Sequence, residues 1–154
     1  MDVSEKTLNK IVKSYPQDRH YVLAALQDMQ ASFNYIPKLG LEKLSEHMEV
    51  PVSQLYSMAT FYKALSLKPK GKHIIKVCNG TACHLRGSMN LVTGLKRELG
   101  IDPGETTKDM QFSVDLVNCL GCCALAPVML VDENYHNRLK LEDVKSIVAK
   151  YSKD

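Results

Sequence analysis

The sequence predicts an α+β protein in which a small helical bundle precedes a unit of mixed strands and helices. Three observations lead to this prediction. Apolar residues recur at helical spacing through residues 1–67. Residues 68–72, Lys-Pro-Lys-Gly-Lys, contain both helix breakers and no apolar side chain, which is typical of a solvated linker. From residue 73 to residue 154, short strand-like runs alternate with helical patterns, as in a small α/β domain.

The first part contains four segments with a helical pattern. A short helix is expected over residues 5–13. A second helix has an apolar face at the spacing of about 3.6 residues per turn, formed by Val22, Ala25, Leu26, Met29 and Phe33. A third has Leu41, Leu44 and Met48 on one side and is broken by Pro51. Ser53 is the expected N-cap of a fourth, whose inward residues are Leu55, Met58, Ala59, Tyr62 and Leu65. Because no single helix buries its own apolar face, we predict a bundle over residues 1–67.

Aromatic side chains in the fourth helical segment have two interpretations. Tyr56, Phe61 and Tyr62 are either a docking face for a partner or part of the bundle core. We favour the core, with one aromatic ring exposed, because large aromatic side chains contribute most of their stabilisation when buried.

The pattern of residues 73–154 predicts the order strand, helix, strand, strand, helix. Strands are expected at residues 73–77, at 112–116 (with Phe112, Val114 and Leu116 inward) and at 128–131. Helices are expected over residues 88–99 and about 141–151. Gly100 follows the first of these helices, where a C-terminal cap glycine belongs.

Composition and charge exclude several classes of protein. The chain has 154 residues, of which 45% are hydrophobic and 24% charged, so general disorder is excluded. The 20 Lys and Arg residues against 17 Asp and Glu are spread along the chain, which argues against nucleic-acid binding. No apolar run approaches the roughly 20 residues that a membrane span needs. The N-terminus lacks a basic start and an apolar segment, so a cytoplasmic location without membrane insertion is expected.

All five cysteines lie between residues 78 and 123, in two glycine-containing loops that each follow a predicted strand. A zinc site would use two pairs, Cys78 with Cys83 and Cys119 with Cys122. A 2Fe–2S cluster would use Cys123 in place of Cys122, with two thiolates on each iron. A dithiol redox pair of Cys119 and Cys122 is a third possibility. Spacing alone leaves these interpretations open, but so many clustered thiols disfavour a purely structural role.

Longer motifs around these cysteines resemble a known family. Residues 77–87, Val-Cys-Asn-Gly-Thr-Ala-Cys-His-Leu-Arg-Gly, and residues 119–128, Cys-Leu-Gly-Cys-Cys-Ala-Leu-Ala-Pro-Val, are similar to the two ligand loops of the thioredoxin-like 2Fe–2S ferredoxins. Residues 56–62 and 104–107 also resemble family signatures, and the similarity runs from about residue 23 to residue 148. The family includes the small peripheral subunit of respiratory complex I and equivalent subunits of NAD(P)-linked hydrogenases and formate dehydrogenases.

The resemblance implies a thioredoxin-like fold for residues 73–154 and one 2Fe–2S cluster. The family's ligands fall on Cys78, Cys83, Cys119 and Cys123. Cys122 is a departure, because the family usually has a small residue there. Four backbone N–H groups are expected to stabilise the sulfur atoms, those of Gly80, Thr81, Leu120 and Gly121. His84 and Arg86 follow the first pair and are candidates to offset the negative charge of the cluster.

The resemblance also implies a partner. The chain has no G-x-G-x-x-G motif after a strand and no phosphate loop, so it should not oxidise NADH by itself. The implied function is single-electron exchange with a flavoprotein subunit that holds FMN and the NAD(P)(H) site. Other iron–sulfur or catalytic subunits would complete the complex. The alternative is a zinc-binding interaction module without redox activity.

Overall fold

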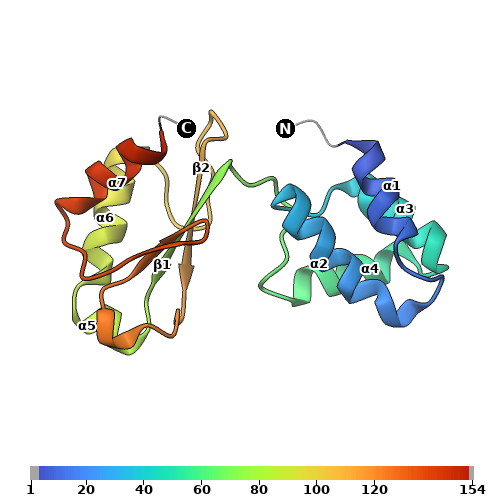
Figure 1. Cartoon of the computed structure of the whole chain (residues 1–154), viewed down its shortest axis with the longest axis horizontal. Coiled ribbons are helices and arrows are strands. Elements are labelled where there is room, and N and C mark those ends of the chain that lie inside the picture. The colour runs from blue at the N-terminus through green and yellow to red at the C-terminus, as the bar shows by residue number, and fades with distance from the viewer. Residues whose placement is uncertain (1–3, 153–154) are drawn as a thin grey trace. The chain divides into compact units, whose positions relative to one another are not determined.

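The computed structural model describes residues 4–152 and is α+β, as predicted. The chain separates into two compact units, Met1–Pro69 and Lys70–Asp154. The first holds only helices, whereas the second combines helices with one sheet (Figure 1). The helices of the first unit are α1 (Glu5–Lys13), η1 (Arg19–Tyr21, a 3-10 helix), α2 (Val22–Phe33), α3 (Lys38–Met48) and α4 (Val52–Phe61). The elements of the second are β1 (His73–Cys78), α5 (Thr81–Leu85), α6 (Ser88–Leu99), β2 (Phe112–Val117), η2 (Cys123–Leu125, a 3-10 helix), β3 (Met129–Val131), β4 (Asn134–His136) and α7 (Asp143–Tyr151).

The helices of the first unit bury their apolar faces in a common core. The fully buried side chains include Leu8, Leu26, Met29, Leu44 and Leu55, so α1 to α4 each contribute. Helices α2 and α3 end at residues in the left-handed conformation, which stops the helical hydrogen-bond pattern. The loop after α4 is fixed to α2, because the Ser66 backbone N–H donates to Gln30 Oε1 at 2.8 Å.

Three predictions about α4 are wrong. Ser53 is not the N-cap, because the helix already begins at Val52 with Pro51 in the cap position. The helix ends at Phe61, so Tyr62 lies beyond it. The aromatic side chains are also not core: Tyr56, Phe61 and Tyr62 are all exposed, and Phe61 is 79% exposed. The buried face of α4 is formed by Leu55 and Ala59.

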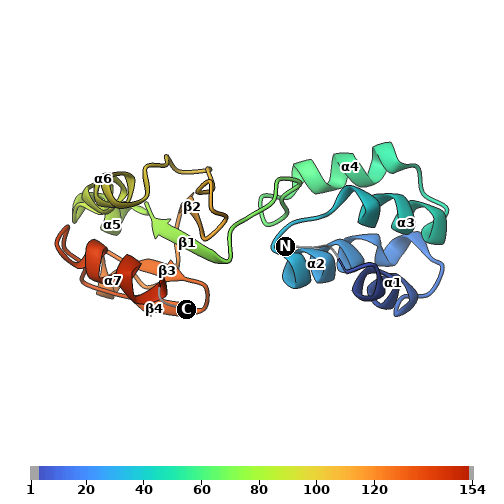
Figure 2. The same cartoon turned by 90° about the horizontal axis from the view of Figure 1, so that it is seen from above.

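The second unit is built on a mixed sheet with the order β2-β1-β3-β4. Strands β1 and β2 are parallel, with His73 opposite Phe112 and Cys78 opposite Val117. Strand β3 runs antiparallel to both β1 and β4. Helices α6 and α7 lie side by side on one face of the sheet (Figure 2). The core between these layers includes Ile75, Val77, Leu91, Leu95, Met129 and Val144.

Most predicted elements of this unit are confirmed, with differences in detail. Helix α6 matches its predicted bounds, and Gly100 caps it in the left-handed conformation, with φ 70°. Strand β4 and helix α5 are additions to the predicted elements. In β2 the predicted alternation fails, because Ser113 is buried and Leu116 is exposed. The structure shows the cause at Ser113: its hydroxyl accepts a hydrogen bond from the Gly71 backbone N–H at 2.7 Å.

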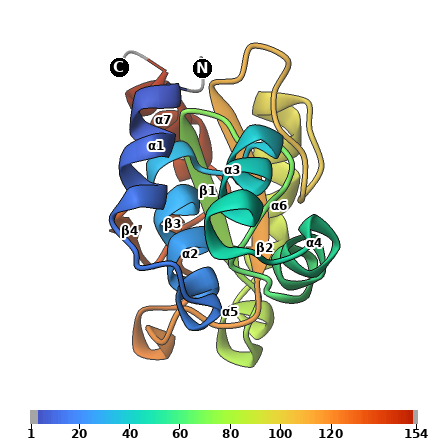
Figure 3. The same cartoon turned by 90° about the vertical axis from the view of Figure 1, so that its right-hand side faces the viewer.

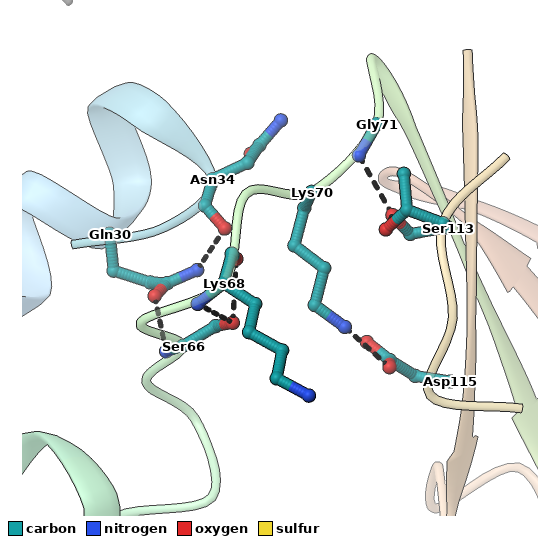
Figure 4. Close-up of polar contacts among 9 residues, drawn as sticks. Gln30, Asn34, Ser66, Lys68, Lys70, Gly71, Ser113 and Asp115 are labelled. Carbon is teal, nitrogen blue, oxygen red and sulfur yellow. Dashed lines mark hydrogen bonds and ion pairs between the residues drawn. The ribbon is translucent and has the colours of Figure 1, made fainter. Parts of the chain in front are cut away.

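The segment 68–72 is not simply a solvated linker, because its second half is held to β2 (Figure 4). Lys70 Nζ lies 2.6 Å from Asp115 Oδ1, and only 14% of the lysine side chain is exposed. Gly71 passes so close to the sheet that a Cβ there would lie 2.8 Å from backbone atoms of Phe112. The start of β1 is therefore fixed beside β2, which sets the register on which the cysteine loops depend.

Candidate metal centre

The sheet brings the two cysteine loops to one edge. Cys78 is the last residue of β1, and Cys83 lies one short loop later, in α5. Cys119, Cys122 and Cys123 follow the end of β2. Because β1 and β2 are parallel and adjacent, their carboxyl ends meet at the same edge of the sheet. The predicted convergence of the two loops is therefore present in the structure.

Glycine permits the close approach of these loops. A Cβ at Gly80 would lie 2.7 Å from the backbone oxygen of Asn118, a distance that real Cβ contacts do not show. Two backbone hydrogen bonds hold the loops in place: the Asn79 N–H donates to Val117 O at 2.7 Å, and the Cys78 N–H donates to Val128 O at 3.1 Å. Position 80 thus requires glycine for steric reasons.

Four of the five thiols form a continuous chain of neighbours. The thiols of Cys83 and Cys119 both lower the pKa of the Cys78 thiol, so the three thiols are neighbours. Cys119 Sγ in turn lies 3.9 Å from Cys123 Sγ. Cys78 and Cys83 are buried, whereas Cys119 and Cys123 are exposed. Within residues 4–152, no three His, Cys, Asp or Glu side chains are arranged around a point that would hold a single metal ion.

The electrostatics of the four thiols reflect their proximity. Burial raises the pKa of the Cys78 thiol, but backbone N–H groups of Gly80 and Leu120, with the thiols of Cys83 and Cys119, outweigh it, so the net pKa is lowered. Burial raises the pKa of Cys83, and so does the interaction in which its thiol donates to Cys78. The hydrogen bond with Cys119 and its negative charge raise the pKa of Cys123. The shifts thus favour the thiolate form at Cys78 and disfavour it at Cys83 and Cys123.

Backbone N–H groups are directed at the sulfur atoms at three of the four predicted positions; among the described residues, no such contact is seen for Thr81, the fourth. Gly80 and Leu120 donate to Cys78, and the Gly121 N–H donates to Cys119 Sγ at 3.3 Å. Sequence reasoning missed a fourth donor, the backbone N–H of Val128, which hydrogen-bonds the Cys83 thiol. No motif signals it, because it depends on β3 lying next to β1.

Cys122 is placed differently from the other four cysteines. Its Sγ lies 3.7 Å from the backbone oxygen of Leu120, within its own loop. The side chain is partly buried and packs against the buried cluster of Cys78, Cys83, Ala126 and Val128. Cys122 therefore lies beside the chain of thiols and does not extend it.

The polar residues after the first loop make local contacts. His84 Nδ1 lies 3.0 Å from Asn79 Oδ1, and the histidine is exposed. Arg86 Nη1 donates to Ala126 O at 3.4 Å, so this side chain joins the end of α5 to the segment after η2. A role for either residue in offsetting cluster charge stays a prediction.

Comparison with known proteins identifies the family. The sequence model of the thioredoxin-like 2Fe–2S ferredoxin family matches residues 8–152. The chain belongs to this family. The family implies a 2Fe–2S cluster, and the donor set of this ferredoxin fits one: four neighbouring thiols, two glycine-containing loops and N–H groups directed at sulfur.

Two relatives are similar over nearly all of the ferredoxin. It is 38% identical over 142 residues to the HndA subunit of the NADP-reducing hydrogenase of Solidesulfovibrio fructosivorans, and the match covers 92% of this chain and 83% of that protein. It is 36% identical over 147 residues to a subunit of the NADH-quinone oxidoreductase of Rickettsia bellii, and that match covers 94% of this chain and 88% of the relative.

A solved structure shares the fold. The NAD+-reducing NiFe-hydrogenase in its H2-reduced state matches with a TM-score of 0.76 and 22% identity, over 90% of this chain and 23% of that chain. The ferredoxin thus spans about a quarter of the hydrogenase chain that it matches. Within the described part of the ferredoxin, no helix is long and apolar enough to cross a membrane.

Proposed function

We propose that this ferredoxin is an electron-transfer subunit that exchanges single electrons with a flavoprotein subunit of a multi-subunit NAD(P)H-linked oxidoreductase. The observation that supports it most strongly is the chain of four thiols at one sheet edge, in a member of a 2Fe–2S family. The cluster, when bound, supplies a site that accepts and releases one electron.

The proposed ligands are Cys78 and Cys83 on one iron and Cys119 and Cys123 on the other. Thiolates are the soft ligands that iron–sulfur clusters require. Each proposed pair comes from one loop, so each loop holds one iron. The Gly80, Leu120, Gly121 and Val128 N–H groups stabilise negative charge on the sulfur atoms, and this tunes the potential of a bound cluster.

Burial divides the proposed ligands into an inner and an outer pair. Cys78 and Cys83 are 3% and 2% exposed, whereas Cys119 and Cys123 are exposed to solvent. The inner pair excludes water from one side of the site. The outer pair forms the side from which a redox partner approaches.

The relatives and the sequence support this choice of partner. The names of the two similar proteins are those of subunits of an NADP-reducing hydrogenase and of an NADH-quinone oxidoreductase. Since this chain has no nucleotide-binding glycine loop, FMN and the NAD(P)(H) site are assigned to the flavoprotein subunit. Further iron–sulfur or catalytic subunits of the same complex complete the assembly. Clustered cysteines are more often metal ligands than disulfides in a reducing compartment, so we place the protein in the cytoplasm.

Anaerobic purification of the full chain tests the proposal. We expect a brown protein with two irons and two sulfides per chain, whose visible absorption falls on addition of dithionite. A colourless protein with one zinc per chain would instead support the interaction module. Isolated holoprotein should show no NADH oxidation, whereas the intact complex should reduce this cluster when NADH or NADPH is added.

A further inference from the structure

Helix α5 carries Cys83 but is too short to hold its own place. It has five residues, and isolated helices shorter than about 12 residues are marginal in water. Its N-cap residue is Gly80, which has no side chain to accept a hydrogen bond from the first turn. The helix lies at the end of α6 where that longer helix begins (Figures 1 and 3). The position of the Cys83 thiol therefore depends on the contacts that join α5 to β1 and α6.

The side chain of Asn79 makes such contacts to both helices. Asn79 directly follows Cys78, the last residue of β1, and its side chain is half-buried. Its Oδ1 lies 3.0 Å from His84 Nδ1 in α5. The same oxygen accepts a hydrogen bond from the hydroxyl of Ser88, the first residue of α6, at 3.1 Å. One amide oxygen thus joins the end of the strand to α5 and to α6.

The burial of Ser88 makes this oxygen hard to replace. Ser88 is 0% exposed, so water does not reach its hydroxyl in place of Asn79. Without the amide oxygen, a buried hydroxyl would have no partner, which costs free energy. Helix α6 has 12 residues and packs in the core through Leu91 and Leu95, so it is a firm support. Asn79 is therefore anchored on α6, and through His84 it holds α5 in turn.

We propose that Asn79 is a positioning residue that sets the separation of the Cys78 and Cys83 thiols. It acts on Cys78 as its neighbour in the chain and on Cys83 through His84, the next residue of α5. Because these two thiols are the proposed ligands of one iron, the inference rests on the proposed function. It adds the side chain that fixes the geometry of that iron site. Hydrogen-bond partners that orient metal ligands in this way strongly affect metal affinity.

The test compares Asn79→Leu with Asn79→Asp in the full-length holoprotein. Leucine has a similar shape and no acceptor atom, whereas aspartate keeps an oxygen in the same place. Two quantities are measured: the rate at which a chelator removes iron, and the visible circular dichroism of the cluster, which reports the arrangement of its ligands. We expect Asn79→Leu to release iron about tenfold faster or more, with an altered dichroism spectrum. Asn79→Asp should restore the rate and the spectrum of the wild type.

Two further variants complete the test. Asn118→Leu is the matched control: Asn118 also directly follows a strand and is next to a proposed ligand, but it is exposed, and no hydrogen bond of its side chain is seen within residues 4–152. It should release iron at the wild-type rate. Ser88→Ala should accelerate release, and adding it to Asn79→Leu should cause no further acceleration, because both changes break the same network.

The outcomes distinguish failure of the inference from failure of the proposed function. A wild-type rate and spectrum in Asn79→Leu would overturn the positioning role and leave the proposed function intact, because the cluster is still held. Equal acceleration in Asn79→Asp or in Asn118→Leu would also overturn it, since the amide oxygen would then not be what the site requires. If Asn79→Leu holds no cluster at all, Ser88→Ala decides: faster release supports the inference, and the wild-type rate overturns it. A wild-type chain that binds no cluster would instead overturn the proposed function itself.

Discussion

At the scale of single residues, the choice between Cys122 and Cys123 decides the ligand set. Spacing alone does not distinguish them, because both positions complete a plausible metal site. In the structure, Cys123 Sγ lies 3.9 Å from Cys119 Sγ, whereas Cys122 Sγ lies 3.7 Å from the Leu120 carbonyl oxygen and packs against the cluster that includes Cys78 and Cys83, so the assignment of Cys123 stays a proposal. Cys123 is the first residue of η2, whereas Cys122 is its N-cap residue.

The paired variants Cys123→Ser and Cys122→Ser test this assignment. We expect Cys123→Ser to lose most of its iron, because one iron then lacks a thiolate ligand. Cys122→Ser should retain two irons per chain with an unchanged visible spectrum. Iron analysis and anaerobic absorption spectra measure both. The assignment would be wrong if the two variants gave the opposite result.

Gly80 gives a second prediction at this scale. A methyl group at this position meets the Asn118 oxygen, so Gly80→Ala must separate the two cysteine loops. We expect a loss of about 1–3 kcal/mol of stability, with faster loss of iron to a chelator. Gly104→Ala is the control, because Gly104 lies outside the cysteine loops. We expect it to cost about 1–2 kcal/mol of stability, since Gly104 has a left-handed backbone conformation. A Cβ at this position meets nothing within 4 Å. Equal chelation rates in the two variants would show that the loop contact does not control the site.

At the scale of elements, long periodic segments are predictable and short ones are not. Helix α6 has three turns of regular spacing and a glycine cap, and its bounds follow from the sequence. Strand β4 has only three residues, and α5 has five, so neither carries enough residues to show a period. The alternation of buried and exposed residues expected in β2 fails at Ser113. The hydroxyl of this residue accepts a hydrogen bond from the Gly71 backbone N–H, 42 residues away in the sequence. Such tertiary contacts leave no local signal.

The contact between β4 and α7 predicts a dependence of stability on pH. His136 Nε2 lies 3.2 Å from Tyr151 Oη. Burial lowers the pKa of His136 in the folded protein, and Lys150 lowers it further. The unfolded chain therefore binds the proton more tightly, so this contribution to stability is present above about pH 6.5 and is lost as the pH falls through the folded pKa. Thermal unfolding of wild type and His136→Gln between pH 7.5 and 5.5 measures it, and the variant should lose less stability over that range.

At the scale of the whole molecule, the two units have separate cores. The core of the first is drawn from residues 8–65 and that of the second from residues 75–151, with no shared member among the described residues. The breaker-rich segment 68–72 and the change of pattern after it make this organisation visible in the sequence. The exposure of the aromatic residues of α4 is not predictable in the same way. A helical period shows which residues share a face of the helix, but it does not show how far the other helices of the bundle cover that face.

Separate cores predict that damage to one unit leaves the other intact. Leu44→Ala and Leu91→Ala each remove a buried leucine side chain, one from each core, and each should cost about 2–5 kcal/mol. In holoprotein, we expect Leu44→Ala to lower the temperature at which helical circular dichroism begins to fall, without changing that at which the visible signal of the cluster disappears. Leu91→Ala should lower the temperature at which the visible signal of the cluster disappears, because Leu91 packs against the sheet that positions the cysteine loops. If both variants shift the cluster signal equally, the two units unfold as one cooperative structure and the bundle contributes directly to retention of the cluster.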